Sequence, residues 1–190
     1  MKDDKVNFEG FPKIARLSRE CIITEKIDGT NAQIYIGEPE VVDDKITYSF
    51  QVGSRSRWIT PDDDNFGFAR WAYEHKEELI NGLGPGRHFG EWWGQGIQRN
   101  YGLKEKRFSL FNTSRWMDNR PECCHVVPII ETSQFDKIDF IKIILGLVSH
   151  GSYAAPGFMK PEGIVVFHVA SGCLFKKTID HDEIPKGAVR

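Results

Sequence analysis

Long apolar runs are absent from this 190-residue sequence. Its hydrophobic stretches all fall well short of the roughly 20 residues that cross a bilayer as a helix. Residues 1–9 are rich in charged side chains, where a secretory signal would have an apolar core. We therefore expect a soluble protein with no membrane partner, located in the cytoplasm, or in the host cytoplasm if its source is a virus.

Cysteine is scarce in the sequence. The four cysteines include no Cys-x-x-Cys spacing, which argues against both a disulfide scaffold and a zinc finger. The adjacent Cys123, Cys124 and His125 could bind a metal ion, but a buried cysteine in a strand is the commoner arrangement.

An excess of positive charge is also absent. The formal net charge of −2 argues against a protein that coats nucleic acid through its overall charge, so any phosphate binding must be local. Cationic side chains gather in three places, which are Arg55 with Arg57, the segment 99–107, and Lys176 with Lys177. Solvated charged loops are the alternative explanation, above all for the middle group.

What the sequence does contain is a series of strand-like segments interrupted by two helix-like ones. Apolar residues bounded by Gly, Pro or charged residues predict strands at 20–26, 32–36, 45–52, 87–94, 107–112, 124–130, 162–169 and 172–178. Apolar residues at helical spacing predict helices over 66–80 and 135–151, the second with Asp136 near its start. This order favours an α+β fold of mainly antiparallel sheets with flanking helices, in a single domain over residues 1–190.

The segment EKIDGTNAQ places Lys26 two residues before the pair Asp28-Gly29, at the end of a predicted strand. Glycine permits a tight turn that keeps the backbone close to a ligand. A lysine attacks only after it has lost a proton, and neighbouring cations favour the reactive amine while carboxylates favour the ammonium. An ordinary surface charge in a turn is the alternative, since this short motif is weak alone.

Lys26-x-Asp28-Gly29 resembles the nucleotidyl-acceptor motif of the covalent nucleotidyltransferases, which include DNA ligases, RNA ligases and mRNA capping enzymes. Further segments resemble that superfamily's motifs in the right order, namely SRSR (54–57), FGEWWG (89–94), FSLFN (108–112), EGIVV (162–166) and LFKKT (174–178). The resemblance implies an ATP-grasp-like adenylation domain. It covers most of the chain.

The resemblance also implies a role for each matching residue. Lys26 would be the catalytic nucleophile, and Glu162 would lie near it and near a Mg²⁺ or Mn²⁺ ion. Phe111 would stack on the purine, a contact worth about 1–3 kcal/mol. Taken alone, Phe111 fits a core residue and Glu91 an exposed strand charge, so the joint pattern carries these assignments. The residues implied in nucleotide binding are Glu25, Asp28, Asn31, Arg55, Glu91, Phe111, Glu162, Lys176 and Lys177.

Two departures from the superfamily pattern stand out. The phosphate-binding Lys-x-Lys is here Lys176-Lys177-Thr178, which makes Lys176 the safer assignment. Residues 178–190 are too few for the OB-fold domain that follows in most DNA ligases and capping enzymes. We therefore expect no C-terminal OB domain in this chain, and an accessory protein or domain could supply its residues.

Asn31 indicates the branch of the superfamily, because DNA ligases usually have an arginine at this place. EKIDGTN is similar to phage-type RNA ligases, including those that seal double-stranded RNA. The resemblance implies an ATP-dependent RNA ligase of RNA repair. Lys26 would take AMP from ATP and pass it to an RNA 5′-phosphate, which a 3′-hydroxyl then attacks. Candidate contacts to the RNA backbone are Arg99, Lys104, Lys106 and Arg107.

Three alternatives are also compatible with the sequence. GTP-dependent capping and DNA ligation use the same lysine chemistry, and an aromatic ring would stack on either purine. A nucleotide- or RNA-binding module that keeps the fold without turnover is the third, and it would bind ATP without covalent capture.

Overall fold

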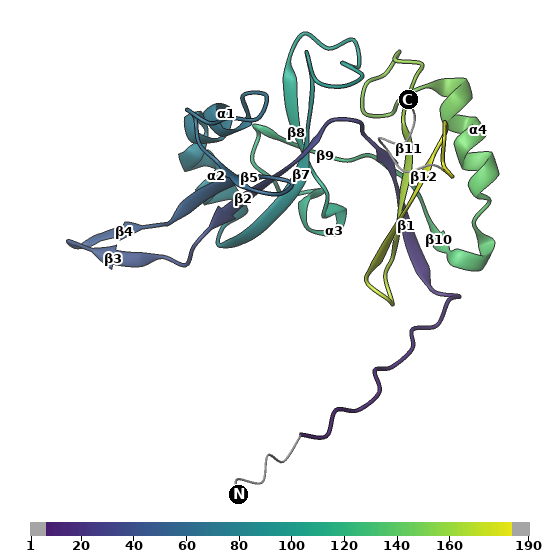
Figure 1. The fold of residues 1–190 in the computed structure, drawn as a ribbon, viewed down its shortest axis with the longest axis horizontal. Coiled ribbons are helices and arrows are strands. Elements are labelled where there is room, and N and C mark those ends of the chain that lie inside the picture. The colour runs from purple at the N-terminus through teal and green to yellow at the C-terminus, as the bar shows by residue number, and fades with distance from the viewer. Residues whose placement is uncertain (1–6, 184–190) are drawn as a thin grey trace, which may run out of the picture.

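The computed structural model describes residues 7–183. Two sheets make up most of the structure and lie beside each other, as Figure 1 shows. A four-stranded sheet has the order β10-β1-β11-β12 and is antiparallel throughout. Its strands are β1 (Glu20–Lys26), β10 (Ile129–Gln134), β11 (Gly163–His168) and β12 (Cys173–Thr178).

The second sheet has six strands in the order β6-β5-β2-β7-β8-β9. They are β2 (Thr30–Ile36), β5 (Phe50–Ser54), β6 (Trp58–Ile59), β7 (Gly86–Gly94), β8 (Lys106–Leu110) and β9 (Cys124–Val126). Only its β8–β9 pair is parallel. A separate hairpin of β3 (Glu40–Val42) and β4 (Lys45–Thr47) projects from this sheet (Figure 1).

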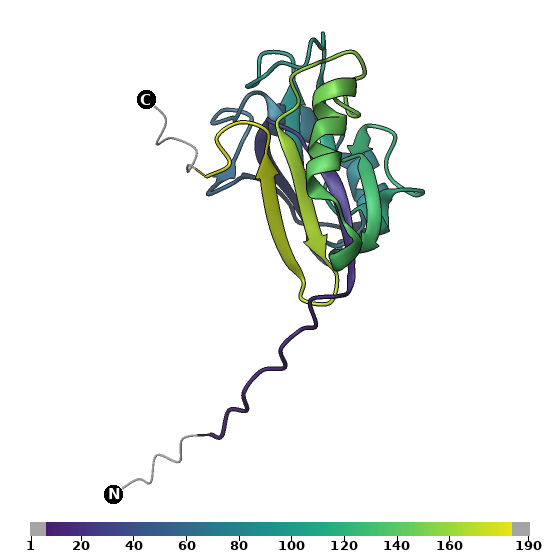
Figure 2. The ribbon, with the colours of Figure 1, turned by 90° about the vertical axis from the view of Figure 1, so that its right-hand side faces the viewer.

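Helices cover one face of each sheet. α1 (Phe68–Glu74) and α2 (Lys76–Leu83) bury Phe68, Ala72 and Leu79 against the apolar face of the six-stranded sheet. α4 (Phe140–His150) packs Ile143 and Leu147 against the four-stranded sheet, and Figure 2 shows it alongside those strands. The shorter α3 (Thr113–Trp116) and the 3₁₀ helix η1 (Phe135–Lys137) complete the helices of the described part of the chain.

A third apolar cluster joins the two sheets. It contains Trp93 of β7 together with Ile27, Tyr101, Val127 and Ala155, which lie in loops, and two of these loops link the two sheets. Ile27 lies in the link between β1 and β2, so the chain crosses from one sheet to the other directly over this cluster.

The expected α+β class with mainly antiparallel sheets is confirmed, but several element boundaries were wrong. The predicted strand 45–52 is interrupted at Tyr48 and Ser49, and the predicted strand 124–130 is interrupted at Val127 and Pro128. Pro128 has no N–H for a ladder, and the chain changes sheet there. The predicted helix 66–80 breaks at His75.

The start of the predicted helix 135–151 was also misplaced. Asp139 caps α4 by accepting from the backbone N of Lys142 at 2.9 Å, whereas Asp136 accepts from the hydroxyl of Ser18. A carboxylate three residues before a free helical N–H satisfies the cap geometry, and Asp139 has that spacing.

Two of the cysteines lie in or beside the core of the six-stranded sheet. Cys124 is 2% exposed and packs in the core of the six-stranded sheet, while Cys123 is half-buried beside it. Across residues 7–183, no helix is both long enough and apolar enough to span a bilayer.

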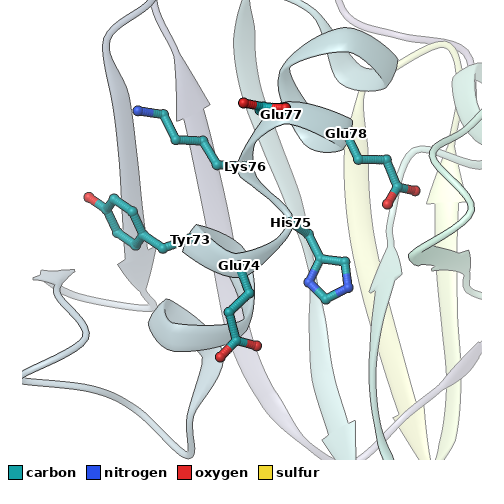
Figure 3. A pocket seen from close by; sticks show the side chains of 6 residues that line it. All are labelled: Tyr73, Glu74, His75, Lys76, Glu77 and Glu78. Carbon is teal, nitrogen blue, oxygen red and sulfur yellow. The ribbon is translucent and has the colours of Figure 1, made fainter.

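One surface hollow lies at the junction of α1 and α2, where Tyr73 to Glu78 line it (Figure 3). The side chains in Figure 3 point outward in different directions and do not converge on one point. This hollow lies at the break between the two helices, on the helical side of the six-stranded sheet.

The packing of α4 predicts a clear stability difference between two leucines of one helix. Leu147 is fully buried against the sheet, and Leu145 is 58% exposed. Leu147→Ala should lower the free energy of unfolding by about 2–5 kcal/mol, because it leaves a cavity. Leu145→Ala should change it by less than about 0.5 kcal/mol. Urea denaturation checks both, and equal losses would contradict the packing described.

Candidate active site

The end of β1 and the start of β11 bring a lysine and a glutamate together. Lys26 is the last residue of β1 and lies opposite Gly163, so Glu162 is adjacent to it. Nζ of Lys26 donates to Oε2 of Glu162 at 2.6 Å. The lysine side chain is 22% exposed and the glutamate side chain 7%, so this pair combines a buried carboxylate with a cation that solvent reaches.

A second buried carboxylate, Glu91 on β7, lies opposite Asn31 on β2. One carboxylate oxygen accepts from the backbone N of Gly29 at 3.0 Å and the other from the side-chain amide of Asn31 at 2.8 Å. Burial raises the pKa of Glu91 to about 7, while the Asn31 hydrogen bond, the charge of Lys26 and the Gly29 hydrogen bond act in the opposite direction. Glu91 therefore changes charge near neutral pH.

Gly29 has a packing reason to be glycine. A Cβ at this position would lie 2.4 Å from the carbonyl oxygen of Trp92 and 2.7 Å from Cβ of Trp93. Only a residue without a side chain lets the link from β1 approach β7 this closely. The approach brings the turn after Lys26 to Glu91.

Asp28 is held from the loop between β7 and β8. Nε of Arg99 donates to Oδ2 of Asp28 at 3.1 Å, and the hydroxyl of Tyr101 accepts from the Asp28 backbone N at 2.7 Å. Arg99 also donates to the carbonyl of Lys160 at 3.0 Å, shortly before Glu162 in the chain. One arginine thus connects the turn after Lys26 with the segment that carries Glu162.

The family model described as RNA ligase matches residues 19–178. The chain belongs to the RNA ligase family. A search of curated protein sequences found no match.

Solved structures of an RNA ligase from Naegleria gruberi share the fold. The structure of a mutant without ligand is 21% identical in sequence to this chain, with a TM-score of 0.57. The match covers 84% of this chain and 49% of the Naegleria gruberi chain. A mutant with ATP and Mn is 20% identical with a TM-score of 0.56, covering 86% and 51%. A mutant with AMP and Mn is 20% identical with a TM-score of 0.54, covering 85% and 50%. The chain thus spans about half the length of these solved chains.

Phe111 lies on the same face of the six-stranded sheet as Glu91. Glu91 is paired with Ser109, and Phe111 follows two residues later, where its backbone N donates to the carbonyl of Phe89 at 3.0 Å. Side chains two residues apart share a face. Phe111 is 42% exposed and Phe89 is 51% exposed, so this RNA ligase family chain presents two aromatic rings beside its buried glutamate.

The lysine pair of β12 is divided between the two faces of its sheet. Lys176 lies opposite Val165, which lies opposite Thr24, and this row shares its face with Lys26. Lys177 lies opposite Ile164 of the α4 core, and its Nζ donates to Asp182 at 3.1 Å. Lys176 therefore lies on the same face of the sheet as Lys26, and Lys177 lies on the other face.

Glu25 also faces away from Lys26, because neighbours along a strand alternate. Its side chain is fully engaged by the segment after α4. It accepts from the hydroxyl of Ser152 at 2.6 Å and from the backbone N of Tyr153 at 2.7 Å and of Ala154 at 2.9 Å. Burial raises its pKa, and these three hydrogen bonds oppose the shift. The carboxylate predicted to bind the nucleotide is thus already hydrogen-bonded to the protein, on the face opposite Lys26.

The cations expected to hold RNA are mostly engaged elsewhere. Arg99 is internal to the site, Arg107 pairs with Glu105 at 2.5 Å, and Lys106 donates to the carbonyl of Phe66 at 2.7 Å. Lys104 is exposed. Arg55 follows the last residue of β5 and is exposed in the loop to β6.

Sequence reasoning missed Tyr101, Ser152 and the contacts of Arg99. Their partners are distant along the chain and no motif marks them, so only the tertiary structure brings them to the site.

The raised pKa of Glu91 predicts a pH-dependent stability difference. Between about pH 4.5, its ordinary value, and about pH 7, the unfolded chain releases this proton while the folded chain keeps it. Wild-type stability should therefore fall relative to Glu91→Gln by about 1–3 kcal/mol as pH rises across this window. Urea denaturation at several pH values measures it. Exposed Glu74→Gln should follow the wild-type profile, and a Glu91→Gln profile parallel to wild type would contradict the shift.

The bridging contacts of Arg99 predict that two cations of one loop contribute differently to the free energy of unfolding. Arg99→Ala removes a charge-assisted hydrogen bond and leaves the buried Asp28 carboxylate with one donor fewer, so it should cost about 1.5–3 kcal/mol. Lys104→Ala, at an exposed position, should cost less than about 0.5 kcal/mol. Thermal or urea unfolding of both variants tests this, and an Arg99→Ala protein as stable as wild type would refute the bridge.

Proposed function

We propose that this chain is an ATP-dependent RNA ligase that forms a covalent lysyl-AMP intermediate on Lys26. The observation that carries the proposal is the contact of 2.6 Å between Nζ of Lys26 and Oε2 of Glu162, beside the buried Glu91. Membership in the RNA ligase family supports the same activity. Residues 1–190 would form one nucleotidyltransferase domain of the ATP-grasp-like type.

The nucleotide would lie on the face of the six-stranded sheet that carries Glu91 and Phe111. An exposed aromatic ring stacks on a purine with about 1–3 kcal/mol. A carboxylate with two oxygens accepts hydrogen bonds from a ribose diol, and Asn31 fixes the orientation of Glu91 at 2.8 Å. Lys176 and Arg55 are exposed cations for the phosphates, while Asp28 acts through its contact with Arg99.

Lys26 would attack the α-phosphorus of ATP. A bond from Nζ to phosphorus forms, the bond from phosphorus to the pyrophosphate oxygen breaks, and pyrophosphate leaves with the electron pair. The lysine must first give up a proton, and Glu162 is within hydrogen-bond distance to accept it. Lys176 would offset the negative charge that grows on the phosphate oxygens.

The residues fit a divalent ion that is held mainly by the nucleotide. Among residues 7–183 there is no group of three or more His, Cys, Asp or Glu side chains that could hold a metal ion. Mg²⁺ commonly binds through one or two carboxylates together with substrate phosphates, and Glu162 offers such a carboxylate. A bound Mg²⁺ or Mn²⁺ would stabilise the charge on the departing pyrophosphate.

The later steps would consume RNA ends. AMP passes from Lys26 to an RNA 5′-phosphate, and an RNA 3′-hydroxyl then attacks that phosphate and releases AMP. The substrate would be a broken RNA with a 5′-phosphate and a 3′-hydroxyl, in RNA repair. An accessory protein or domain could take part. The Naegleria gruberi structures with ATP and Mn or with AMP and Mn concern chains about twice as long.

Covalent labelling tests the proposal. The chain is incubated with Mg²⁺ and ATP labelled on the α-phosphate, denatured, and analysed for retained label. Wild type should retain label from α-labelled but not from γ-labelled ATP, and Lys26→Ala should retain none. Lys142→Ala, which removes an exposed lysine of α4, should match wild type. Glu162→Gln should reduce labelling by roughly 10²-fold or more, as loss of a group acting in proton transfer does.

Three outcomes would contradict it. Label that persists in Lys26→Ala would place the acceptor elsewhere. Label from GTP instead of ATP would favour a capping-type nucleotidyltransferase. Binding of ATP to the folded protein without any label would favour a non-catalytic module.

A further inference from the structure

The face of the six-stranded sheet opposite α1 and α2 carries more aromatic rings than the nucleotide site uses. Trp58 lies opposite Gly53, Gly53 opposite Gln33, and Gln33 opposite Phe89, so these four positions form one row across four strands. A Cβ on Gly53 would lie 2.9 Å from Cγ of Gln33, which confirms that the row shares one face. Trp58 is 44% exposed and Phe89 51%.

Arg87 lies opposite Tyr35 in the neighbouring row of the same face and connects it with the row of Trp58 and Gln33. Its Cζ lies 5.1 Å from the ring centroid of Tyr35 and 5.3 Å from that of Trp58, and it donates to Oε1 of Gln33 at 3.0 Å. The Tyr35 and Trp58 rings are 6.5 Å apart. The cluster therefore holds planar groups in fixed positions at the surface, with no aliphatic side chain among them.

We propose that this aromatic–arginine face, made of Tyr35, Trp58, Arg87 and Phe89, binds unpaired nucleotides of an RNA strand. The inference rests on the proposed function and extends it to the path of the RNA substrate. Unpaired bases stack on aromatic rings and on guanidinium planes, and such stacking tolerates any sequence. The face continues from Asn31 and Glu91 along β2 and β7, so a strand whose end is at Lys26 can run across it.

The position of the face favours RNA over a protein partner. Tyr, Trp, Phe and Arg are also enriched in protein interfaces, but this face continues along β2 and β7 to Asn31 and Glu91, where the nucleotide would lie. It offers rings, one guanidinium and the amide of Gln33. Base recognition uses the same three kinds of group.

Binding of a fluorescein-labelled oligouridine of about 12 nucleotides tests the inference. A 5′-hydroxyl end prevents AMP transfer, so binding is measured without reaction. Trp58→Ala and Arg87→Ala should each weaken binding at least about fivefold, the size expected from one stacked base. Trp58→Phe, which keeps a ring, should stay within about twofold of wild type. Trp58→Ala should leave the slope of affinity against salt concentration unchanged, because it removes no cation.

Matched controls come from other faces. Phe175→Ala removes a 55% exposed ring from β12, and Arg70→Ala removes an exposed arginine from α1 on the helical side of the sheet. Both should bind the oligonucleotide like wild type. All variants should form lysyl-AMP at the wild-type rate, which separates this inference from the proposed function.

Three results would overturn the inference. One is unchanged RNA binding by the double variant that combines Trp58→Ala with Arg87→Ala. Another is a wild-type chain that forms lysyl-AMP and binds no oligouridine. The third is a change in oligomeric state of the double variant with unchanged RNA binding, which would make the face a protein interface. Lysyl-AMP failure with face-dependent RNA binding would support the inference and contradict only the proposed function.

Discussion

The direct crossing of the chain from one sheet to the other, between Lys26 and Thr30, is the constraint on which the site depends. Ile27 is buried in the cluster that joins the sheets, Asp28 is bound by Arg99 and Tyr101, and Gly29 packs against β7. Every residue of the crossing is therefore held by a different kind of contact. Since Lys26 is the last residue before it, the same contacts fix where the lysine meets Glu162.

Two buried carboxylates share this small region with one lysine, and their environments differ. Glu162 contacts Lys26 directly, while Glu91 is bound by the amide groups of Gly29 and Asn31. Burial raises the pKa of Glu91 to about 7, which leaves it able to be neutral or charged near neutral pH. A nucleotide on this face would bring hydroxyl donors to Glu91 and phosphates toward Lys26 and Lys176. In the proposed chemistry Glu162 accepts the proton of Lys26, and Glu91 binds the ribose.

Motif order predicted the centre of the site, because its members lie at strand ends that the antiparallel sheet brings together. Lys26 and Glu162 are such a pair, and the α+β class followed from the same strand pattern. The motifs do not show to which face of the sheet each side chain points, whereas the strand register does. The register turns Glu25 and Lys177 away from Lys26. Glu25 is next to Lys26 in the sequence, and Lys177 is next to Lys176, which lies on the same face as Lys26. Arg99, expected on the RNA, is internal because a distant loop folds over the crossing.

The most direct test of this account is to locate the modified residue. Wild-type protein is incubated with Mg²⁺ and ATP, digested, and mapped by tandem mass spectrometry. The account predicts AMP on one residue, Lys26, joined through its side-chain nitrogen. AMP on any other residue, or an unmodified Lys26 peptide in protein that binds ATP, would contradict it.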